Sequence, residues 1–126
     1  MEIVRGHIQA FGRDAAKALS FLDPYVVMDT SRVGGADPAY GHEGLAKAAR
    51  DYLGAFEEYV YEAERLSDLG SAGVLAVVVE SGRGKSSGVP VHRSYATLYT
   101  LIDGKIARVT VFPSEAEALE AAGLSE

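Results

Sequence analysis

The sequence predicts an α+β fold, in which helices precede an antiparallel sheet and a short helix ends the chain. Three observations support this prediction. Apolar side chains recur at helical spacing over residues 45–56. From residue 59 to residue 112 strand patterns replace the helical one, and Asp103-Gly104 is a two-residue hairpin signal. Ser114 and Glu117 then form a capping box, in which each side chain satisfies a free backbone N–H of the other residue.

The first helix is predicted over residues 4–22, where apolar side chains recur at steps of three and four. Gly6 and Gly12 weaken this pattern. Asp23-Pro24 ends it, because proline disfavours helical geometry in the residue before it. The apolar stripe consists of Val4, Ile8, Phe11, Ala15, Ala18 and Leu22.

A strand at residues 25–29 and a glycine- and proline-rich loop at residues 30–40 lead into the second helix. Behind that helix, residues 59–65 alternate tyrosine and alanine with glutamate, as a strand with one wetter face does. Residues 74–79 are apolar at every position, which predicts a strand that is buried on both faces near the middle of the sheet.

The stretch Gly82-Arg-Gly-Lys-Ser-Ser-Gly88 contains letters typical of a phosphate-binding loop, which requires GxxxxGK[ST] and a helix directly after it. Val79 stands where the first glycine would be, and the residues that follow are β-branched and aromatic and include Pro90. We therefore expect a solvated hairpin loop and no nucleotide site. Strands at residues 91–102 and 105–112 complete a meander of four strands.

Composition limits the classes of function. The 126 residues suit one domain, residues 1–126, and no run of 18 apolar residues is present that could cross a membrane. The net charge of −6, with 12 basic and 18 acidic residues, argues against a nucleic-acid partner. The lack of cysteine excludes disulfides and thiol nucleophiles, and the three histidines share no metal-ligand spacing. The N-terminus lacks the apolar core of a signal peptide, so we expect a cytoplasmic protein.

The order of elements resembles the nuclear transport factor 2-like superfamily, in particular its SnoaL-like and ketosteroid isomerase-like group. Tyr40-Gly-His-Glu-Gly44 and the ending from Leu98 to Leu124 carry the most specific likeness. The resemblance covers nearly the whole chain. It implies a cone-shaped, curved antiparallel sheet against the N-terminal helices, a pocket on the concave face, a homodimer through the sheet and no cofactor. It assigns no reaction, because this fold hosts isomerases, dehydratases, cyclases and pure binding proteins.

Asp29 is the sharpest candidate for catalysis. Residues 23–29 resemble the first strand of ketosteroid isomerase, and this resemblance implies that Asp29 is the general base that moves a proton beside a carbonyl. The two acidic donors of that enzyme have no match, because Arg5 and Leu98 stand near their positions. We therefore reject steroid isomerisation and keep Asp29 as a polar group of the pocket.

Asp29 also has a structural alternative, which is to cap the turn at Thr30-Ser31. Alternation places its side chain on the same face of the strand as Val27. If that face is the concave one, we expect burial to raise the pKa of Asp29, since Arg32 is the only obvious cationic partner nearby in the sequence.

His92 is the second catalytic candidate, because an imidazole can act as an acid or a base near neutral pH. An exposed or hydrogen-bonded structural histidine is the commoner alternative, both here and at His7. His42, at the start of the second helix, suits a packing or capping role.

Five further residues are candidates for ligand binding. Arg32, in the predicted loop, would bind a carboxylate or pair with a surface neighbour. Glu80 would face the hollow or be a solvated hairpin residue, and we favour the solvated position. The tyrosine-rich strands would line either the hollow or the dimer face, since tyrosine suits both settings. The candidates are Arg32, Glu80, Tyr95, Thr97 and Tyr99.

The leading hypothesis is a small-molecule-binding protein whose apolar cone pocket takes an apolar or ring-containing ligand. Its enzymatic form would be a weak acid–base isomerase, cyclase or dehydratase that uses Asp29. The alternative is a non-enzymatic dimeric binding or assembly module, whose pocket is filled by its own aromatic side chains. Both hypotheses expect a homodimer and neither a nucleic-acid nor a membrane partner.

Overall fold

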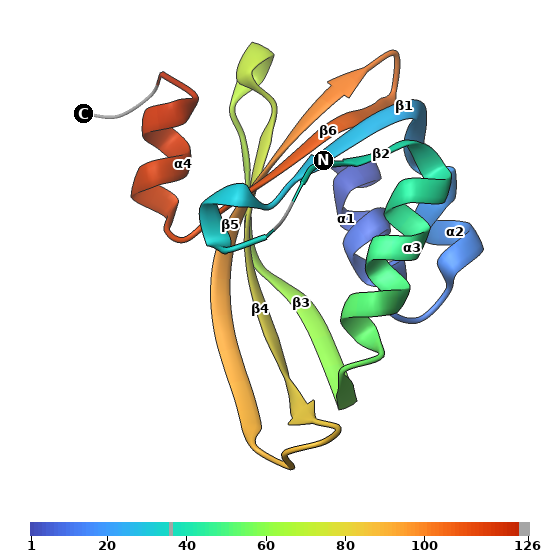
Figure 1. The fold of residues 1–126 in the computed structure, drawn as a ribbon. Coiled ribbons are helices and arrows are strands. Elements are labelled where there is room, and N and C mark those ends of the chain that lie inside the picture. Colours follow the sequence, from blue (N-terminus) through green and yellow to red (C-terminus); the bar gives the residue numbers. More distant parts are fainter. Residues whose placement is uncertain (36, 124–126) are drawn as a thin grey trace.

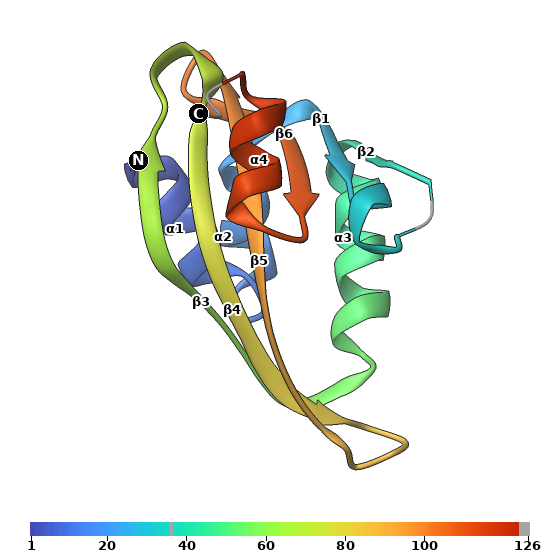
Figure 2. The ribbon, with the colours of Figure 1, turned by 90° about the vertical axis from the view of Figure 1, so that its left-hand side faces the viewer.

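The structure is a computed structural model that describes residues 1–35 and 37–123. Its strands form one curved sheet of six strands (Figure 1). The helices of the N-terminal half cover one side of this sheet, and the C-terminal helix lies on the other side (Figure 2). The predicted α+β class with a curved sheet is confirmed. Leu124, which ends the quoted C-terminal stretch, lies outside the described residues.

The helices and strands follow the predicted order, with additions: the first helix is divided in two, the short strand β2 lies at the end of the predicted loop over residues 30–40, and 3-10 helices lie at Ser31–Val33 and Gly70–Ala72. The N-terminal half contains α1 (Glu2–Ala10), α2 (Ala15–Ser20), β1 (Leu22–Asp29), β2 (Ala39–Tyr40) and α3 (Gly41–Leu53). The C-terminal half contains β3 (Phe56–Asp68), β4 (Val74–Gly84), β5 (Pro90–Ile102), β6 (Lys105–Phe112) and α4 (Glu115–Ala121).

The strands lie in the order β2-β1-β6-β5-β4-β3. β3 to β6 are antiparallel neighbours, so the predicted meander of four strands is confirmed. β1 pairs parallel with β6 and antiparallel with β2. The prediction that residues 74–79 lie near the middle of the sheet is wrong, because β1 and β2 extend the sheet beyond β6 and leave β4 next to the edge strand β3.

The predicted single helix over residues 4–22 is two helices. Gly12 has a φ of 78°, a left-handed conformation that glycine adopts without strain, and the chain turns there. Asp14 then caps α2 by accepting a hydrogen bond from the Lys17 backbone N–H at 3.1 Å. α1 and α2 pack against each other, so their apolar side chains keep the same spacing across the turn. The sequence pattern therefore resembles that of one helix.

Several boundaries also differ from the prediction, and β3 and β4 are both longer than predicted. β1 begins at Leu22 and therefore includes Pro24. α3 begins at Gly41 and ends at Leu53, so Phe56 belongs to β3 and not to the helix. The ring of Phe56 packs against two tyrosines, which explains why an apolar residue at helical spacing takes part in the sheet.

The sheet has an inner face toward α1 and α3 and an outer face toward α4. β4 alternates between them, with Val74, Ala76 and Val78 in the inner core and Leu75 in the outer core. Helix α4 covers the outer core through Ala118. The prediction that this strand is buried on both faces is confirmed.

The turns follow their sequence signals. Asp103 and Gly104 have φ values of 50° and 76°, as a tight hairpin between twisted strands requires. Ser114 caps α4 by accepting a hydrogen bond from the Glu117 backbone N–H at 3.3 Å. Residues 85–89 connect β4 to β5, so the hairpin predicted over residues 82–88 is present but its loop begins later, because β4 continues to Gly84. Within the described ranges no helix has the length and apolar character needed to span a membrane.

Candidate functional site

The most unusual side chain of the inner face is Glu80, near the end of β4. Only 2% of its side chain is exposed. The alternation that turns Val74, Ala76 and Val78 inward also turns Glu80 inward. The solvated outward position that we favour from the sequence is therefore wrong, because the apolar run of β4 continues its inner face through Glu80.

Three side chains donate hydrogen bonds to the Glu80 carboxylate. The Tyr52 hydroxyl lies 2.6 Å from Oε2 and 2.9 Å from Oε1. The Tyr59 hydroxyl lies 2.6 Å from Oε1, and Arg93 Nε lies 3.0 Å from Oε2. Arg93 Nη2 also donates to the Tyr52 hydroxyl at 3.2 Å. We call these four residues the Glu80 cluster.

Each member of the Glu80 cluster comes from a different element. Tyr52 lies in the last turn of α3, Tyr59 in β3 and Arg93 in β5, where it is the register partner of Glu80. The cluster therefore ties α3 to three adjacent strands. This connection crosses the space between α3 and the sheet that is visible in Figure 1.

An irregularity in β3 shapes this region. The register of β3 against β4 shifts between Glu57 and Val60, where Glu58 has a φ of 54°. The extra residue reverses the alternation, so Phe56 and not Glu57 shares the inner face with the tyrosines. Gly82 lies opposite this bulge, and a Cβ atom there would be 3.2 Å from the Glu57 carbonyl oxygen.

Aromatic rings surround the buried carboxylate. Their centroids lie between 4.8 and 6.4 Å apart, within the range of favourable ring pairs. This arrangement excludes water from much of the carboxylate's surroundings. The rings belong to Phe11, Tyr52, Phe56, Tyr59 and Tyr61.

The electrostatics of the Glu80 cluster fix the direction of its hydrogen bonds. Burial and then the hydrogen bond to Glu80 raise the pKa of both Tyr52 and Tyr59 well above the ordinary phenol value. Both hydroxyls stay protonated at neutral pH and donate to the carboxylate. A carboxylate that already accepts hydrogen bonds from three side chains holds those side chains in position. It is poorly suited to removing a proton from a ligand.

Further polar side chains lie on the inner face of β5, next to the Glu80 cluster. Tyr95, Thr97 and Tyr99 alternate with outward residues and pair with Val78, Ala76 and Val74 of β4. Thr97 is 1% exposed and Tyr99 is 2% exposed, whereas Tyr95 is half-buried. Four of the five ligand-binding candidates, Glu80 included, therefore share the inner face. Tyr59, Tyr61, Tyr95 and Tyr99 all lie on the hollow side and not on the outer face.

Asp29 lies on the opposite side of the sheet. It pairs in register with Thr110, while Met28 before it belongs to the inner core. Ser31 donates two hydrogen bonds to Asp29 Oδ1, from its hydroxyl at 2.7 Å and from its backbone N–H at 2.9 Å. The structural alternative, a cap of the following turn, is therefore present.

The pKa of Asp29 is expected to be raised only if its side chain lies on the concave face of the sheet, and its side chain lies on the other face. The hydrogen bonds from Ser31 lower the pKa of Asp29, and the charges of Arg32 and Arg108 lower it further. Each guanidinium lies 3.5 Å from Oδ2. Arg32 also stacks over the Phe112 ring at 4.9 Å, so it has the surface pairing that we expect as the commoner case.

The three histidines do not come together in the inner-face site. His92 is exposed on the outer face of β5, beside the inward Arg93. His7 Nδ1 donates to the Ala18 carbonyl oxygen at 3.0 Å, and His42 Nε2 donates to the Leu22 carbonyl oxygen at 2.9 Å. Both bonds join α1 or α3 to a neighbouring segment, which is a structural role.

Sequence reasoning missed Tyr52 and Arg93. Tyr52 belongs to the apolar stripe of its helix, so its hydroxyl gives no separate signal. Arg93 could have been found, because counting back by two from Tyr95 puts it on the same face of the strand. Within residues 1–35 and 37–123, no group of three or more histidine, aspartate or glutamate side chains could hold a metal ion.

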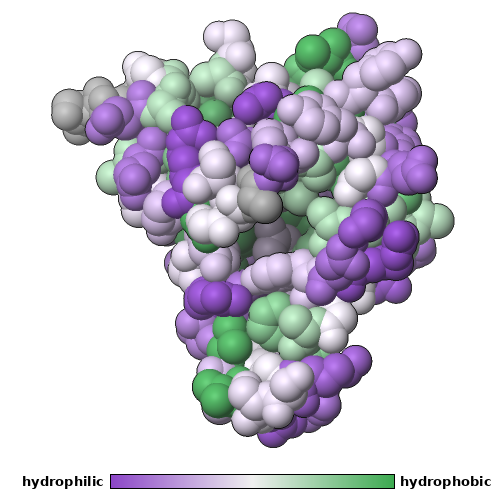
Figure 3. Space-filling model, in the orientation of Figure 1, coloured by the Kyte–Doolittle hydropathy of each residue, from purple (hydrophilic) through white to green (hydrophobic). Residues whose placement is uncertain are grey.

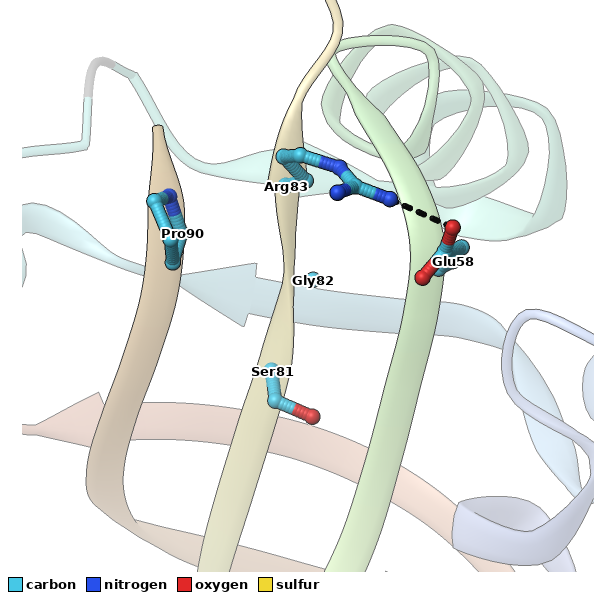
Figure 4. A pocket seen from close by; sticks show the side chains of 5 residues that line it. All are labelled: Glu58, Ser81, Gly82, Arg83 and Pro90. Atoms are coloured by element: carbon cyan, nitrogen blue, oxygen red, sulfur yellow. Dashed lines mark hydrogen bonds and ion pairs between the residues drawn. The ribbon is translucent and has the colours of Figure 1, made fainter. Parts of the chain in front are cut away.

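The described surface has hollows on more than one side. Figure 3 shows a depression between α3 and the strands, on the side where the inner face opens. A second, open hollow of about 270 Å³ lies at the far end of β3 to β5, where Arg83 pairs with Glu58 beside Ser81, Gly82 and Pro90 (Figure 4). A third, of about 250 Å³, is lined by Arg32, Phe112, Glu117, Glu120 and Ala121 on the outer face.

The family model of the SnoaL-like domain matches residues 4–109 of this chain. Among solved structures, a protein from Catenulispora acidiphila with a ketosteroid isomerase-like fold, in complex with trimethylamine, is 18% identical. That match covers 98% of this chain and 93% of the other with a TM-score of 0.77. No curated protein matches the sequence.

Two further structures carry names of enzymes. An epoxide hydrolase from M. tuberculosis is 16% identical over 90% of this chain and 80% of its own, with a TM-score of 0.70. A candidate polyketide cyclase from Xanthomonas campestris is 20% identical over 96% of this chain and 94% of its own, with a TM-score of 0.72. At these identities the likeness establishes the shared fold alone.

Proposed function

This chain belongs to the SnoaL-like domain family, and from that premise we propose that it binds a small, ring-containing molecule in the hollow between α3 and the inner face of the sheet. The Glu80 cluster forms the polar wall of this site. Tyr95, Thr97 and Tyr99 of β5 provide its inner surface. The relatives of known structure include proteins named for a polyketide cyclase and an epoxide hydrolase, which supports a small molecule as ligand.

The observation that carries this proposal is the buried carboxylate with three donors on an inner face whose other side chains are mainly apolar or aromatic. Burying a carboxylate is costly even when it is paired, so apolar side chains of the same volume would usually stabilise the fold as well. A polar group that persists there therefore favours a function. Ligand pockets are mainly apolar and contain a few placed polar groups, as this face does.

The arrangement favours binding over proton transfer. The Glu80 carboxylate is occupied by its donors, and the two phenols that donate to it hold their protons tightly. Asp29 as the base of an isomerase, cyclase or dehydratase stays a prediction, and it would require a substrate on the outer face. We therefore propose binding as the primary function, with any turnover secondary to it.

A second candidate is a non-enzymatic dimeric module with a filled hollow. It is favoured by the inner core, which already contains the ring of Tyr99, and by large apolar side chains at the surface. Tyr25 is 87% exposed, Tyr40 65% and Ile102 55%. A homodimer through the sheet would cover such side chains. Its mass in solution, measured by light scattering at micromolar concentration, tests this arrangement.

The binding proposal is tested with 2-naphthol, an uncharged and fluorescent two-ring compound. We expect saturable one-site binding by the wild type, measured by fluorescence titration. Tyr95→Ala should weaken binding about tenfold, because truncation of an aromatic anchor in a pocket removes a large share of the contact. His92→Ala is the matched control, since His92 lies on the same strand but on the outer face. Equal affinity in all three proteins would contradict the proposed site.

A further inference from the structure

Helix α3 is attached to the rest of the molecule unevenly along its length. Just before its first residue, Tyr40 of β2 pairs in register with Val27 of β1. In its first turn, His42 Nε2 donates to the Leu22 carbonyl oxygen at 2.9 Å. Leu45, in the next turn, belongs to the inner core and is the one buried residue of α3. The N-terminal half of the helix is therefore held firmly.

The C-terminal half of α3, residues 48–53, has no such anchor in the core. None of its side chains is buried. The ion pair between Lys47 and Asp51 stays within the helix and does not reach the sheet. In the part of the chain that the structure describes, Tyr52 makes the only side-chain hydrogen bonds that join this half of the helix to the sheet.

The Tyr52 side chain spans the distance from the end of α3 to two strands. Its hydroxyl donates to Glu80 of β4 and accepts from Arg93 of β5. Its ring lies beside Phe56 and Tyr59, with centroids 5.2 and 6.3 Å away. The helix itself packs mainly against β1 and β2, at the other end of the sheet order. One side chain therefore closes the inner face on the side of β4 and β5.

The segment that this side chain holds has defined limits. Leu45 fixes the helix before residue 48, and after the helix the Ala55 carbonyl oxygen accepts a hydrogen bond from the Lys85 backbone N–H at 2.8 Å. A segment with few buried apolar contacts opens locally at a much lower free energy than the core does. The depression between α3 and the strands lies beneath this segment (Figure 3).

We propose that residues 48–53 move away from the sheet to admit the ligand to the inner face, and that the Tyr52 hydroxyl holds them closed. This inference rests on the proposed binding function and adds how the ligand enters. A phenol that donates to a carboxylate makes a stronger hydrogen bond than a neutral pair does. Opening is still possible, because Glu80 keeps Tyr59 and Arg93 as donors when Tyr52 leaves, so no buried charge loses all its partners.

The movement is tested by native-state hydrogen exchange on Tyr52→Phe, which keeps the ring and removes the hydroxyl. We expect the amides of residues 48–53 to exchange about tenfold faster than in the wild type, the factor that loss of one hydrogen bond to a charged group gives. The amides of β4 should change by less than about threefold, because they exchange through larger openings. Equal acceleration in α3 and β4 would mean that Tyr52 only stabilises the fold, and would overturn the inference.

Tyr59→Phe is the matched control for the exchange experiment. Tyr59 donates to the same carboxylate as Tyr52, but it lies in β3, which is already paired with β4. The amides of residues 48–53 should therefore exchange within about twofold of the wild-type rate in this variant. A tenfold acceleration there would assign the control of opening to the carboxylate and not to Tyr52, and would contradict the proposal.

Entry of the ligand is tested by stopped-flow fluorescence with 2-naphthol. The association rate constant should rise about fivefold in Tyr52→Phe, because a larger open fraction admits the ligand more often. Tyr40→Phe, at an exposed position before α3, should leave it unchanged. An unchanged rate constant in Tyr52→Phe would overturn the inference and leave the binding function standing. Binding of 2-naphthol to neither protein would overturn the binding function, whereas faster exchange confined to residues 48–53 would still support the movement.

Discussion

Two carboxylates of this protein, Glu80 and Asp29, lie on opposite faces of the same sheet, and both have arginine partners. On the inner face, Glu80 is 2% exposed and accepts hydrogen bonds from three residues of three other elements. On the outer face, Asp29 is 14% exposed, and its short hydrogen bonds come from Ser31, two residues along the chain. Its arginine contacts are longer, at 3.5 Å.

The comparison shows that residue type alone does not define a functional carboxylate. Glu80 joins distant parts of the chain in a dry, aromatic environment, whereas Asp29 closes a local turn. Loss of Glu80 should therefore affect the whole inner face. Loss of Asp29 should affect one turn and its neighbouring arginines.

The largest expected effect is that of Glu80→Ala. It leaves two phenols and a guanidinium without their common acceptor, and loss of a buried group that satisfies several donors is strongly destabilising. We expect the free energy of unfolding to fall by about 3 kcal/mol, measured by urea unfolding. Glu62→Ala, an exposed glutamate on the adjacent strand, should change it by less than about 0.5 kcal/mol. Similar values for the two variants would mean that the Glu80 cluster has no special place in the fold.

A moderate effect is expected from acid, and it should act on the inner side first. Burial lowers the pKa of His7 on α1, although its hydrogen bond to the Ala18 carbonyl opposes this shift. The unfolded chain then binds a proton near pH 6.5 that the folded chain resists. The stability contributed by neutral His7 is fully present above pH 6.5 and is lost as the pH falls toward the folded-state pKa.

Urea unfolding at a series of pH values from 7.5 down to 5.5 measures this dependence. The free energy of unfolding should fall by at most about 1.4 kcal/mol per pH unit in that interval. His7→Gln should flatten the dependence, and His92→Gln, at an exposed position, should leave it unchanged. If His92→Gln flattened it instead, the acid-sensitive group would lie on the outer face.

The smallest effect is expected for Asp29→Ala. It removes the acceptor of the two Ser31 hydrogen bonds, and loss of a capping side chain lowers the free energy of unfolding by about 1 kcal/mol. Because the folded-state pKa of Asp29 is lowered, its contribution is present above pH 3.8 and is lost as the pH falls below that value. Binding of 2-naphthol should be unchanged. A tenfold loss of binding would return Asp29 to the ligand site.

Local signals in the sequence determined much of this fold. Asp103-Gly104, the Ser114 cap and the alternation over residues 59–65 act over a few residues, so each could be recognised without knowledge of the rest of the chain. The resemblance to SnoaL-like proteins, which short motifs carry, predicted that the sheet is curved. For the site, the sequence named Tyr95, Thr97 and Tyr99 as candidates, and their alternate positions place them on one face of β5.

Only the tertiary structure decided which face is the inner one. Alternation states that Asp29 and Val27 share a face, but the parallel pairing of β1 with β6 turns that face outward. The bulge in β3 and the 28 residues that separate Tyr52 from Glu80 are likewise invisible to local patterns. The physical reason is that a strand has two faces of equal geometry. Which of them becomes buried depends on what the rest of the chain packs against it.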